Sequence, residues 1–206
     1  TYRIPTYTDL YYSDPTTLGN ENLDPEEAIS EELGIKYSKN NFNGYVAVFN
    51  RSSNNLIDYV KENPTDLWQA TNIQDVNSFG IDANASYNFK VMDFNQNINL
   101  GYTYLDEDLK SIEANYSRYS INSLKHHVTA TYFSQFLKHI SQSITYKFAE
   151  RTTGESYTVV DFKATLAVAP YEFSVIGNNI FNAEYTETNL VPMPKGNVLL
   201  DLKYRF

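Results

Sequence analysis

The 206-residue sequence contains no cysteine, only one tryptophan and no long apolar run. Without cysteine the chain can form neither a disulfide framework nor a thiolate metal site. No stretch approaches the roughly 18 consecutive apolar residues that a membrane-spanning helix requires. Basic residues are also scarce, because 16 Lys and Arg face 25 Asp and Glu, for a net charge of −9. The composition therefore argues against a helical membrane protein and, since phosphate binding needs a basic stripe, against nucleic acid as a partner.

Aromatic residues are abundant, with 18 Tyr and 12 Phe, although the mean hydropathy is negative. This combination fits a membrane β-barrel with a wet interior, because half of every strand then faces water. The last ten residues show the pattern directly. Val198, Leu200, Leu202, Tyr204 and Phe206 fall on one face of an extended strand, and the opposite face carries three charges. A soluble sandwich strand can look the same, so the recurrence of this pattern decides between the two.

Alternation with a period of two recurs along most of the chain and predicts strands. The clearest expected strands cover residues 32–38, 79–89, 97–104, 128–132, 140–148, 160–168, 171–175 and 197–206. Residues 43–59 are also strand-like, but Val46 and Val48 interrupt the alternation. With a stub at residues 1–4, the sequence predicts an all-β chain of about nine or ten strands.

Short and long connections alternate between the expected strands. The short turns lie at residues 39–43, 90–93, 135–138 and 169–170, and the longer polar links lie at 5–26, 61–66, 107–117, 149–156 and 181–196. An outer-membrane barrel has tight periplasmic turns and long external loops, whereas a Greek-key sandwich has no reason to keep its long loops at one end. The spacing predicts an antiparallel up-and-down transmembrane β-barrel with its C-terminus on the periplasmic side.

Four segments, in order, resemble the C-terminal barrel portion of TonB-dependent outer-membrane receptors, and its cobalamin transporters most closely. They are TYRIPTYTDLYY at 1–12, NENLDPEEAISEELGIKY at 20–37, NNLIDYV at 54–60 with FGIDANASY at 79–87, and GNNIFNAEYTE at 177–187. Two positions depart from the family pattern, since Glu21 replaces a proline and Asp82 replaces a glutamate. The resemblance covers nearly the whole chain and is more specific for the family than for the cargo.

The resemblance implies that residues 1–206 are the C-terminal half of a barrel of about 22 strands, without the plug domain and the first barrel half. Such a receptor imports a bulky, scarce nutrient with energy from the TonB system, which acts through the plug. A corrinoid is the first expected cargo, and an iron-siderophore or haem is the alternative. No cofactor is expected in this chain, although the cobalamin transporter binds calcium in an earlier part of its barrel. Expected partners are outer-membrane lipid, the barrel-assembly machinery, a surface lipoprotein and a second copy pairing at open sheet edges.

Candidate site residues form three groups. Cargo contact is expected from loop residues with Tyr and Arg side chains, which are common at recognition hot spots. These residues are Tyr7, Asp9, Tyr11, Arg118, Tyr119 and Arg151. For any single Tyr, the alternative is an aromatic girdle at the membrane surface.

The second group consists of polar strand residues expected to face the lumen and contact the plug. They are Asn84, Ser86, Asn97, Asn99, Thr103, Ser143, Thr145, Asp161 and Lys163. The third group is the C-terminal set Leu202, Tyr204 and Phe206, which resembles the signal read by the barrel-assembly machinery.

Metal binding and catalysis are not supported by the sequence. The acidic runs at 24–27 and 106–108 lack EF-hand spacing, and the adjacent His126 and His127 would point to opposite faces of a strand. No catalytic constellation or phosphate-binding loop is present. Two other classes stay open: an adhesive or structural barrel without transport, and a soluble lipocalin-type barrel, which would turn the apolar faces inward.

Overall fold

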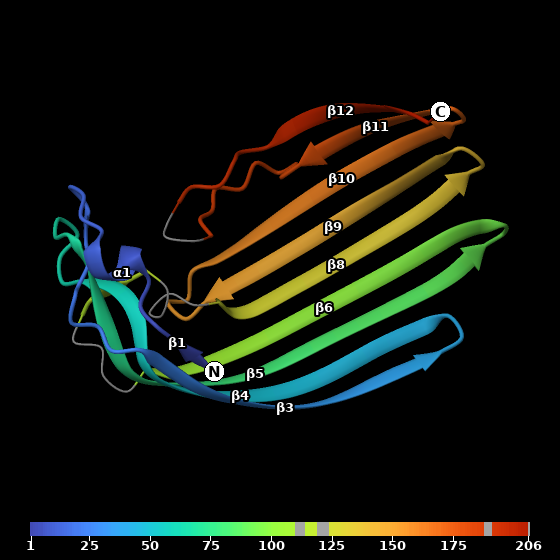
Figure 1. The fold of residues 1–206 in the computed structure, drawn as a ribbon. Helices are drawn as coiled ribbons and strands as arrows, with labels where there is room; N and C mark the ends of the chain where they lie inside the picture. Colours follow the sequence, from blue (N-terminus) through green and yellow to red (C-terminus); the bar gives the residue numbers. More distant parts are fainter. Residues whose placement is uncertain (110–113, 119–123, 188–190, 206) are drawn as a thin grey trace.

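The computed structural model consists almost entirely of one curved antiparallel sheet (Figure 1). It describes residues 1–109, 114–118, 124–187 and 191–205. Nine long strands pair in sequence order. They are β3 (Glu26–Lys39), β4 (Phe42–Lys61), β5 (Trp68–Val91), β6 (Phe94–Leu109), β8 (Leu124–Leu137), β9 (Ile140–Arg151), β10 (Ser156–Val168), β11 (Tyr171–Asn178) and β12 (Asn197–Tyr204). The predicted all-β, antiparallel up-and-down arrangement is confirmed.

Three two-residue strands and one short helix add to this wall. They are β1 (Tyr2–Arg3), which pairs with β3; β2 (Thr17–Leu18), which pairs with β5; β7 (Tyr116–Ser117), which pairs with β4; and α1 (Tyr7–Tyr11). Among the described residues, no helix is long and apolar enough to cross a membrane.

All four tight turns lie at one end of the sheet (Figure 1). Two residues separate β3 from β4, β5 from β6, β8 from β9, and β10 from β11. The connections at the other end are longer, but the strands run further into them than the sequence pattern indicates. The link after β9, expected at 149–156, is only residues 152–155. The backbone ladder continues there because it needs no alternation of side chains.

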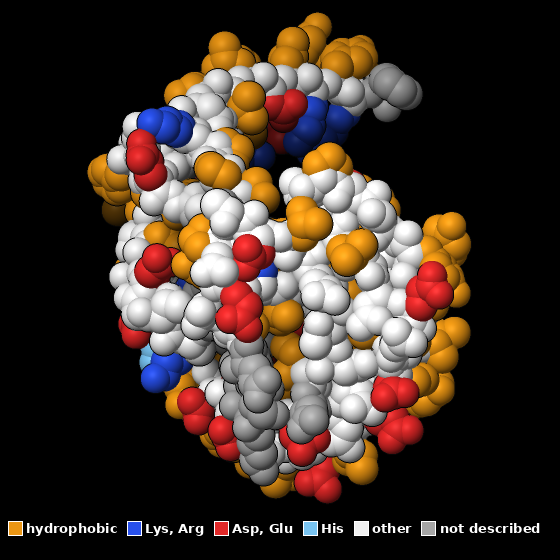
Figure 2. Space-filling model, turned by 90° about the vertical axis from the view of Figure 1, so that its left-hand side faces the viewer, with side chains coloured by type: hydrophobic (Ala, Val, Ile, Leu, Met, Phe, Trp, Pro, Cys, Tyr) orange, Lys and Arg blue, Asp and Glu red, His pale blue; other side chains and the backbone are white. Residues whose placement is uncertain are grey.

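The strand register separates two kinds of side chain onto the two faces of the sheet. Residues directly opposite each other on antiparallel strands share a face. One row across five strands is apolar, and it consists of Tyr87, Ile98, Tyr132, Ile144 and Phe162. The neighbouring row, on the other face, is polar, and it consists of Ser86, Asn99, Thr131, Thr145 and Asp161. Viewed from the loop end, hydrophobic side chains gather around the outer perimeter (Figure 2).

The buried core lies at the loop end rather than in the wall. Leu23, Ile57, Tyr59 and Ala70 form a small cluster, against which Leu10 and Trp68 pack. This cluster joins the N-terminal segment with α1 to the extended ends of β4 and β5. The first loop is therefore held in one arrangement by burial of apolar surface.

Candidate functional site

The inner face of the wall carries all nine residues of the predicted plug-facing group. The register places them in four successive rows of one face, each row beginning on β5. The rows contain Asp82 with Thr103; Asn84; Ser86 with Asn99, Thr145 and Asp161; and Asn88 with Asn97, Ser143 and Lys163. The structure therefore brings these side chains together, while their contact with a plug stays a prediction.

Hydrogen bonds link these inner side chains to one another. Asn84 Nδ2 donates to Asn99 Oδ1 at 3.0 Å, and Asn97 Nδ2 donates to Ser86 Oγ at 3.1 Å. Asp82 accepts from the Thr103 hydroxyl at 3.0 Å. Such a surface of amides and hydroxyls can exchange these bonds for bonds to water or to another chain at little net cost.

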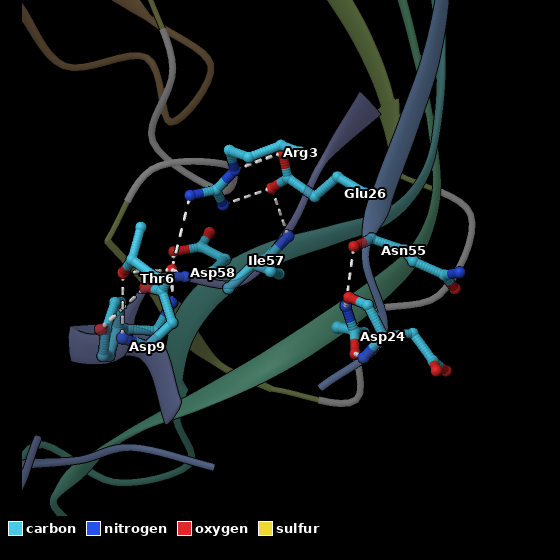
Figure 3. A network of polar contacts seen from close by, with 10 residues as sticks. Arg3, Thr6, Asp9, Asp24, Glu26, Asn55, Ile57 and Asp58 are labelled. Atoms are coloured by element: carbon cyan, nitrogen blue, oxygen red, sulfur yellow. Dashed lines mark hydrogen bonds and ion pairs between the residues drawn. The ribbon is translucent and has the colours of Figure 1, made fainter. Parts of the chain in front are cut away.

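The N-terminal loop is fixed by a network around Arg3 (Figure 3). The guanidinium donates two hydrogen bonds to the Glu26 carboxylate, at 2.7 and 2.6 Å, and lies 3.5 Å from the Asp9 carboxylate. Asp9 also closes a capping box with Thr6 at the start of α1. The Tyr59 hydroxyl donates to Asp9 at 3.1 Å. The Asp9 carboxylate therefore has its hydrogen-bond and ion-pair partners within the chain, and the residue is only 7% exposed.

These contacts shift the pKa values of both carboxyl groups. Burial by itself raises the pKa of Asp9, but hydrogen bonds from the Thr6 amide and hydroxyl and from Tyr59, together with Arg3, outweigh it and lower the pKa. Burial by itself also raises the pKa of Glu26, but the hydrogen bonds from Arg3 and from the Ile57 amide outweigh it and lower this pKa. The bond to Glu26 raises the pKa of Arg3.

Tyr7 and Tyr11 are the exposed members of the predicted cargo-contact group. They lie one helical turn apart on α1, with ring centroids 5.2 Å apart, and are 78% and 52% exposed. Two large aromatic rings that are held together and open to solvent form a surface suited to an apolar or aromatic ligand.

The two predicted arginines that the structure describes have partners in the chain. Arg118 lies over the rings of Tyr59 and Trp68, 4.8 and 5.0 Å from their centroids, and donates to Thr17 Oγ1 at 2.9 Å. Arg151 is buried and donates to the main-chain oxygens of Thr186 and Glu187. Both arginines hold loops in place through these contacts. Tyr119 lies outside the described residues.

At the C-terminal strand, Leu202 and Tyr204 are exposed on the apolar face, opposite Phe173 and Tyr171. Phe206 lies outside the described residues.

The two adjacent histidines separate as expected, because His126 pairs with Tyr104 in one row and His127 with Thr103 in the next. In the described part of the chain, no group of three or more His, Asp or Glu side chains is placed to hold a metal ion.

Sequence reasoning missed a second cluster at the loop end. Lys147 Nζ lies 3.2 Å from Glu187 Oε1, and the Tyr157 and Tyr185 rings stack with centroids 4.6 Å apart. Lys147 and Glu187 are 40 positions apart in the sequence, and the four residues share no motif. Only the opposite charges and the expected long loop were available as signals, and they do not specify a pair.

The geometry defines a class of protein. An antiparallel sheet that turns an apolar face outward and a polar face inward, with tight turns gathered at one end, is the wall of a membrane β-barrel. The model of the "TonB dependent receptor-like, beta-barrel" family matches residues 1–182. The chain belongs to this family of outer-membrane proteins.

Solved structures share the fold. The copper transporter OprC superposes with a TM-score of 0.75 at 14% identity, over 100% of this chain and 35% of that chain. The siderophore receptor PirA from Pseudomonas aeruginosa gives a TM-score of 0.64 at 19% identity, over 98% and 34%. The pyoverdine receptor FpvA from P. aeruginosa PAO1 gives 0.67 at 17% identity, over 100% and 33%. The chain thus spans about a third of the length of these proteins. A search of curated proteins by sequence gave no match.

Proposed function

We propose that the chain is the C-terminal half of the barrel of an outer-membrane receptor that imports a bulky, scarce nutrient with TonB-derived energy. The observation that supports this most directly is the family match over residues 1–182. The polar inner wall fits this role, since it offers a hydrogen-bonding surface to the plug through which the TonB system acts. The structural neighbours, which include a copper transporter and a siderophore receptor, are consistent with this role.

In this proposal the long loops face outside the cell, and the tight turns and the C-terminus face the periplasm. The edge of β12, and the part of the β3 edge that β1 does not cover, pair with the other half of the barrel, because an unpaired strand edge is prone to bind another strand. Leu202, Tyr204 and Phe206 act as the signal for the barrel-assembly machinery. A surface lipoprotein and self-association of the fragment stay open as further partners.

Two cargo classes are proposed. Cobalamin or a related corrinoid follows from the resemblance of the four segments. An iron-siderophore or haem is the alternative, and the siderophore class has support from two structural neighbours, the siderophore receptor PirA and the pyoverdine receptor FpvA.

Import can be tested with the full-length receptor that contains this chain, expressed in a bacterium lacking its own corrinoid and siderophore receptors. Uptake of labelled cyanocobalamin and of ferric pyoverdine is measured with and without an active TonB system. We expect TonB-dependent uptake of one of the two. Uptake of cyanocobalamin alone selects the first cargo class, and uptake of the siderophore alone selects the second. A correctly folded receptor that accumulates neither, and that supports growth on no scarce nutrient supplied as the sole source of iron or corrinoid, overturns the proposal.

A further inference from the structure

The described parts of the connection between β11 and β12, residues 179–187 and 191–196, are hydrogen-bonded to each other. Asn179 caps its start by accepting from the Ala183 amide and donating to the Ala183 carbonyl, each at 2.8 Å. Asn182 Oδ1 accepts from the Gly196 amide at 2.9 Å, and Thr186 forms an isolated bridge with Pro192. Figure 1 shows this connection at the loop end of β10. The fold of the loop presents Glu187 to the inner wall.

Donor groups from the wall converge on Glu187. Its Oε1 atom lies 3.2 Å from Lys147 Nζ on β9 and 3.5 Å from the Tyr157 hydroxyl on β10. Arg151, at the end of β9, donates to the main-chain oxygen of the same residue. Two neighbouring strands thus supply the ammonium and the hydroxyl that a carboxylate accepts from.

Lys147 is the one charged side chain among the described residues of its row on the inner face from β5 to β10, and Asp161 in the next row accepts from the Asn179 amide at 2.7 Å. Its row on the inner face contains Asn84, Gly101, Thr129 and Val159. None of these side chains is ionised. The carboxylate beside Lys147 comes from a loop, whereas Lys147 and Tyr157 come from a nine-strand wall. A displacement of the loop would therefore leave the wall groups in place and would remove from Lys147 the carboxylate with which it pairs.

We propose that Lys147 and Tyr157 form a binding site for a carboxylate on the inner wall, and that Glu187 occupies it as an internal substitute for a ligand. Arg151 is a positioning residue, because it holds the main chain that carries Glu187. This inference rests on the proposed function in its last step only: during import, an anionic group of the cargo displaces Glu187 and releases the loop from the wall.

Citrate is a suitable probe, because it carries carboxylates and can be followed by saturation-transfer NMR on the full-length receptor in detergent. We expect Glu187→Gln to bind citrate about tenfold more tightly than the natural chain, on the scale of one hydrogen bond to a charged group. Lys147→Met should abolish that gain, so that the double variant binds no better than Lys147→Met alone. Tyr157→Phe should remove a smaller part of the affinity.

The matched control is Glu184→Gln, which removes a carboxylate of the same loop that pairs with exposed Lys195 at 2.6 Å. It should leave citrate binding unchanged. Every variant is first checked for the heat-modifiable gel mobility of a folded barrel, which is a difference in migration between unheated and heated samples. The inference is overturned if Glu187→Gln binds citrate no more tightly, or if the gain persists without Lys147. Because citrate binding is measured without transport, it can succeed or fail independently of the import assay.

Discussion

Asp9 and Glu26 are two carboxylates whose charged forms the N-terminal loop stabilises, so this loop should respond to acid. Both have a lowered pKa in the folded chain. Their contribution to stability is therefore fully present above the unfolded values of about 4, and it is lost as the pH falls through the lower folded values. We expect hydrogen exchange at the amides of Leu10 and Ile57, corrected for intrinsic rates, to be faster at about pH 3 than at about pH 6.

The control for this prediction is the double variant Asp9→Asn with Glu26→Gln, which cannot titrate at these positions. Its exchange at Leu10 and Ile57 should be fast at both pH values. Equal protection of the natural chain at both pH values would contradict the stabilising role of the two charges.

Tyr7 and Tyr11 should matter for cargo more than for folding. Both rings are exposed and contact each other, so replacing them removes little buried surface. We expect the double change to alanine to weaken cargo binding at least tenfold, roughly the effect of losing one aromatic hot spot, with little change in thermal stability. Binding to the full-length receptor is the measurement. Tyr12→Ala, at an exposed ring whose hydroxyl donates to Asp14, is the matched control, and an equal loss there would refute a specific role.

At the residue scale, the sequence predicts which kinds of side chain lie in a region better than it predicts which partners those side chains have. The capping box from Thr6 to Asp9 was not predicted, since residues 5–26 were expected to be a link, although a threonine followed three residues later by an acid is a helix-start pattern. The ion pair of Asp9 with Arg3 was not predicted either, because it depends on how the first strand lies beside β3. Tertiary packing decides which charged groups are already paired, and no local pattern records it.

At the scale of elements, the tight turns offer a direct test of backbone strain. Met92, in the turn between β5 and β6, has φ of +56° and is 89% exposed, so it has strain without compensating burial. Asn40, in the turn between β3 and β4, has φ of +51° with a residue type that tolerates it. We expect Met92→Asn to raise the free energy of unfolding by about 1 kcal/mol and Asn40→Met to lower it by about the same.

Urea titration of the refolded barrel in vesicles would measure both effects. The two changes exchange the same pair of residue types in turns of equal length, so each is the control for the other. If both variants shift the unfolding midpoint in the same direction, backbone strain does not govern these turns.

The alternation of side chains predicted most strands because one face of each meets lipid and the other meets water. It was weakest in β4, where Val46 and Val48 point outward with the apolar set while Tyr45 and Phe49 point inward. Both inward rings have local reasons: the Tyr45 hydroxyl donates to Asp82 at 2.7 Å, and Phe49 covers Gly80, which has no side chain. An aromatic residue on the wet face needs such a partner on the next strand, and the sequence of one strand does not reveal it.

At the scale of the whole molecule, the orientation of the two faces can be tested with two neighbouring residues of β6. Leu100 lies in the outward row with Ala85 and Ala130, about 20 Å along the strand from the tight turn. Asn99 lies next to it and points inward. An arginine at the lipid-facing midplane costs roughly 2–4 kcal/mol, whereas an inward arginine meets water and polar groups.

We therefore expect Leu100→Arg to destabilise folding into lipid vesicles by several kcal/mol, roughly the lipid-face cost above, and Asn99→Arg to cost far less. Urea titration followed by the gel mobility of the folded barrel measures both variants under the same conditions. The pair separates the two barrel classes, because a soluble barrel that buries Leu100 in its centre would fold in plain buffer without vesicles. Equal costs in lipid, or the larger cost at Asn99, would mean that the apolar face does not meet the acyl chains, and the receptor assignment would lose its physical basis.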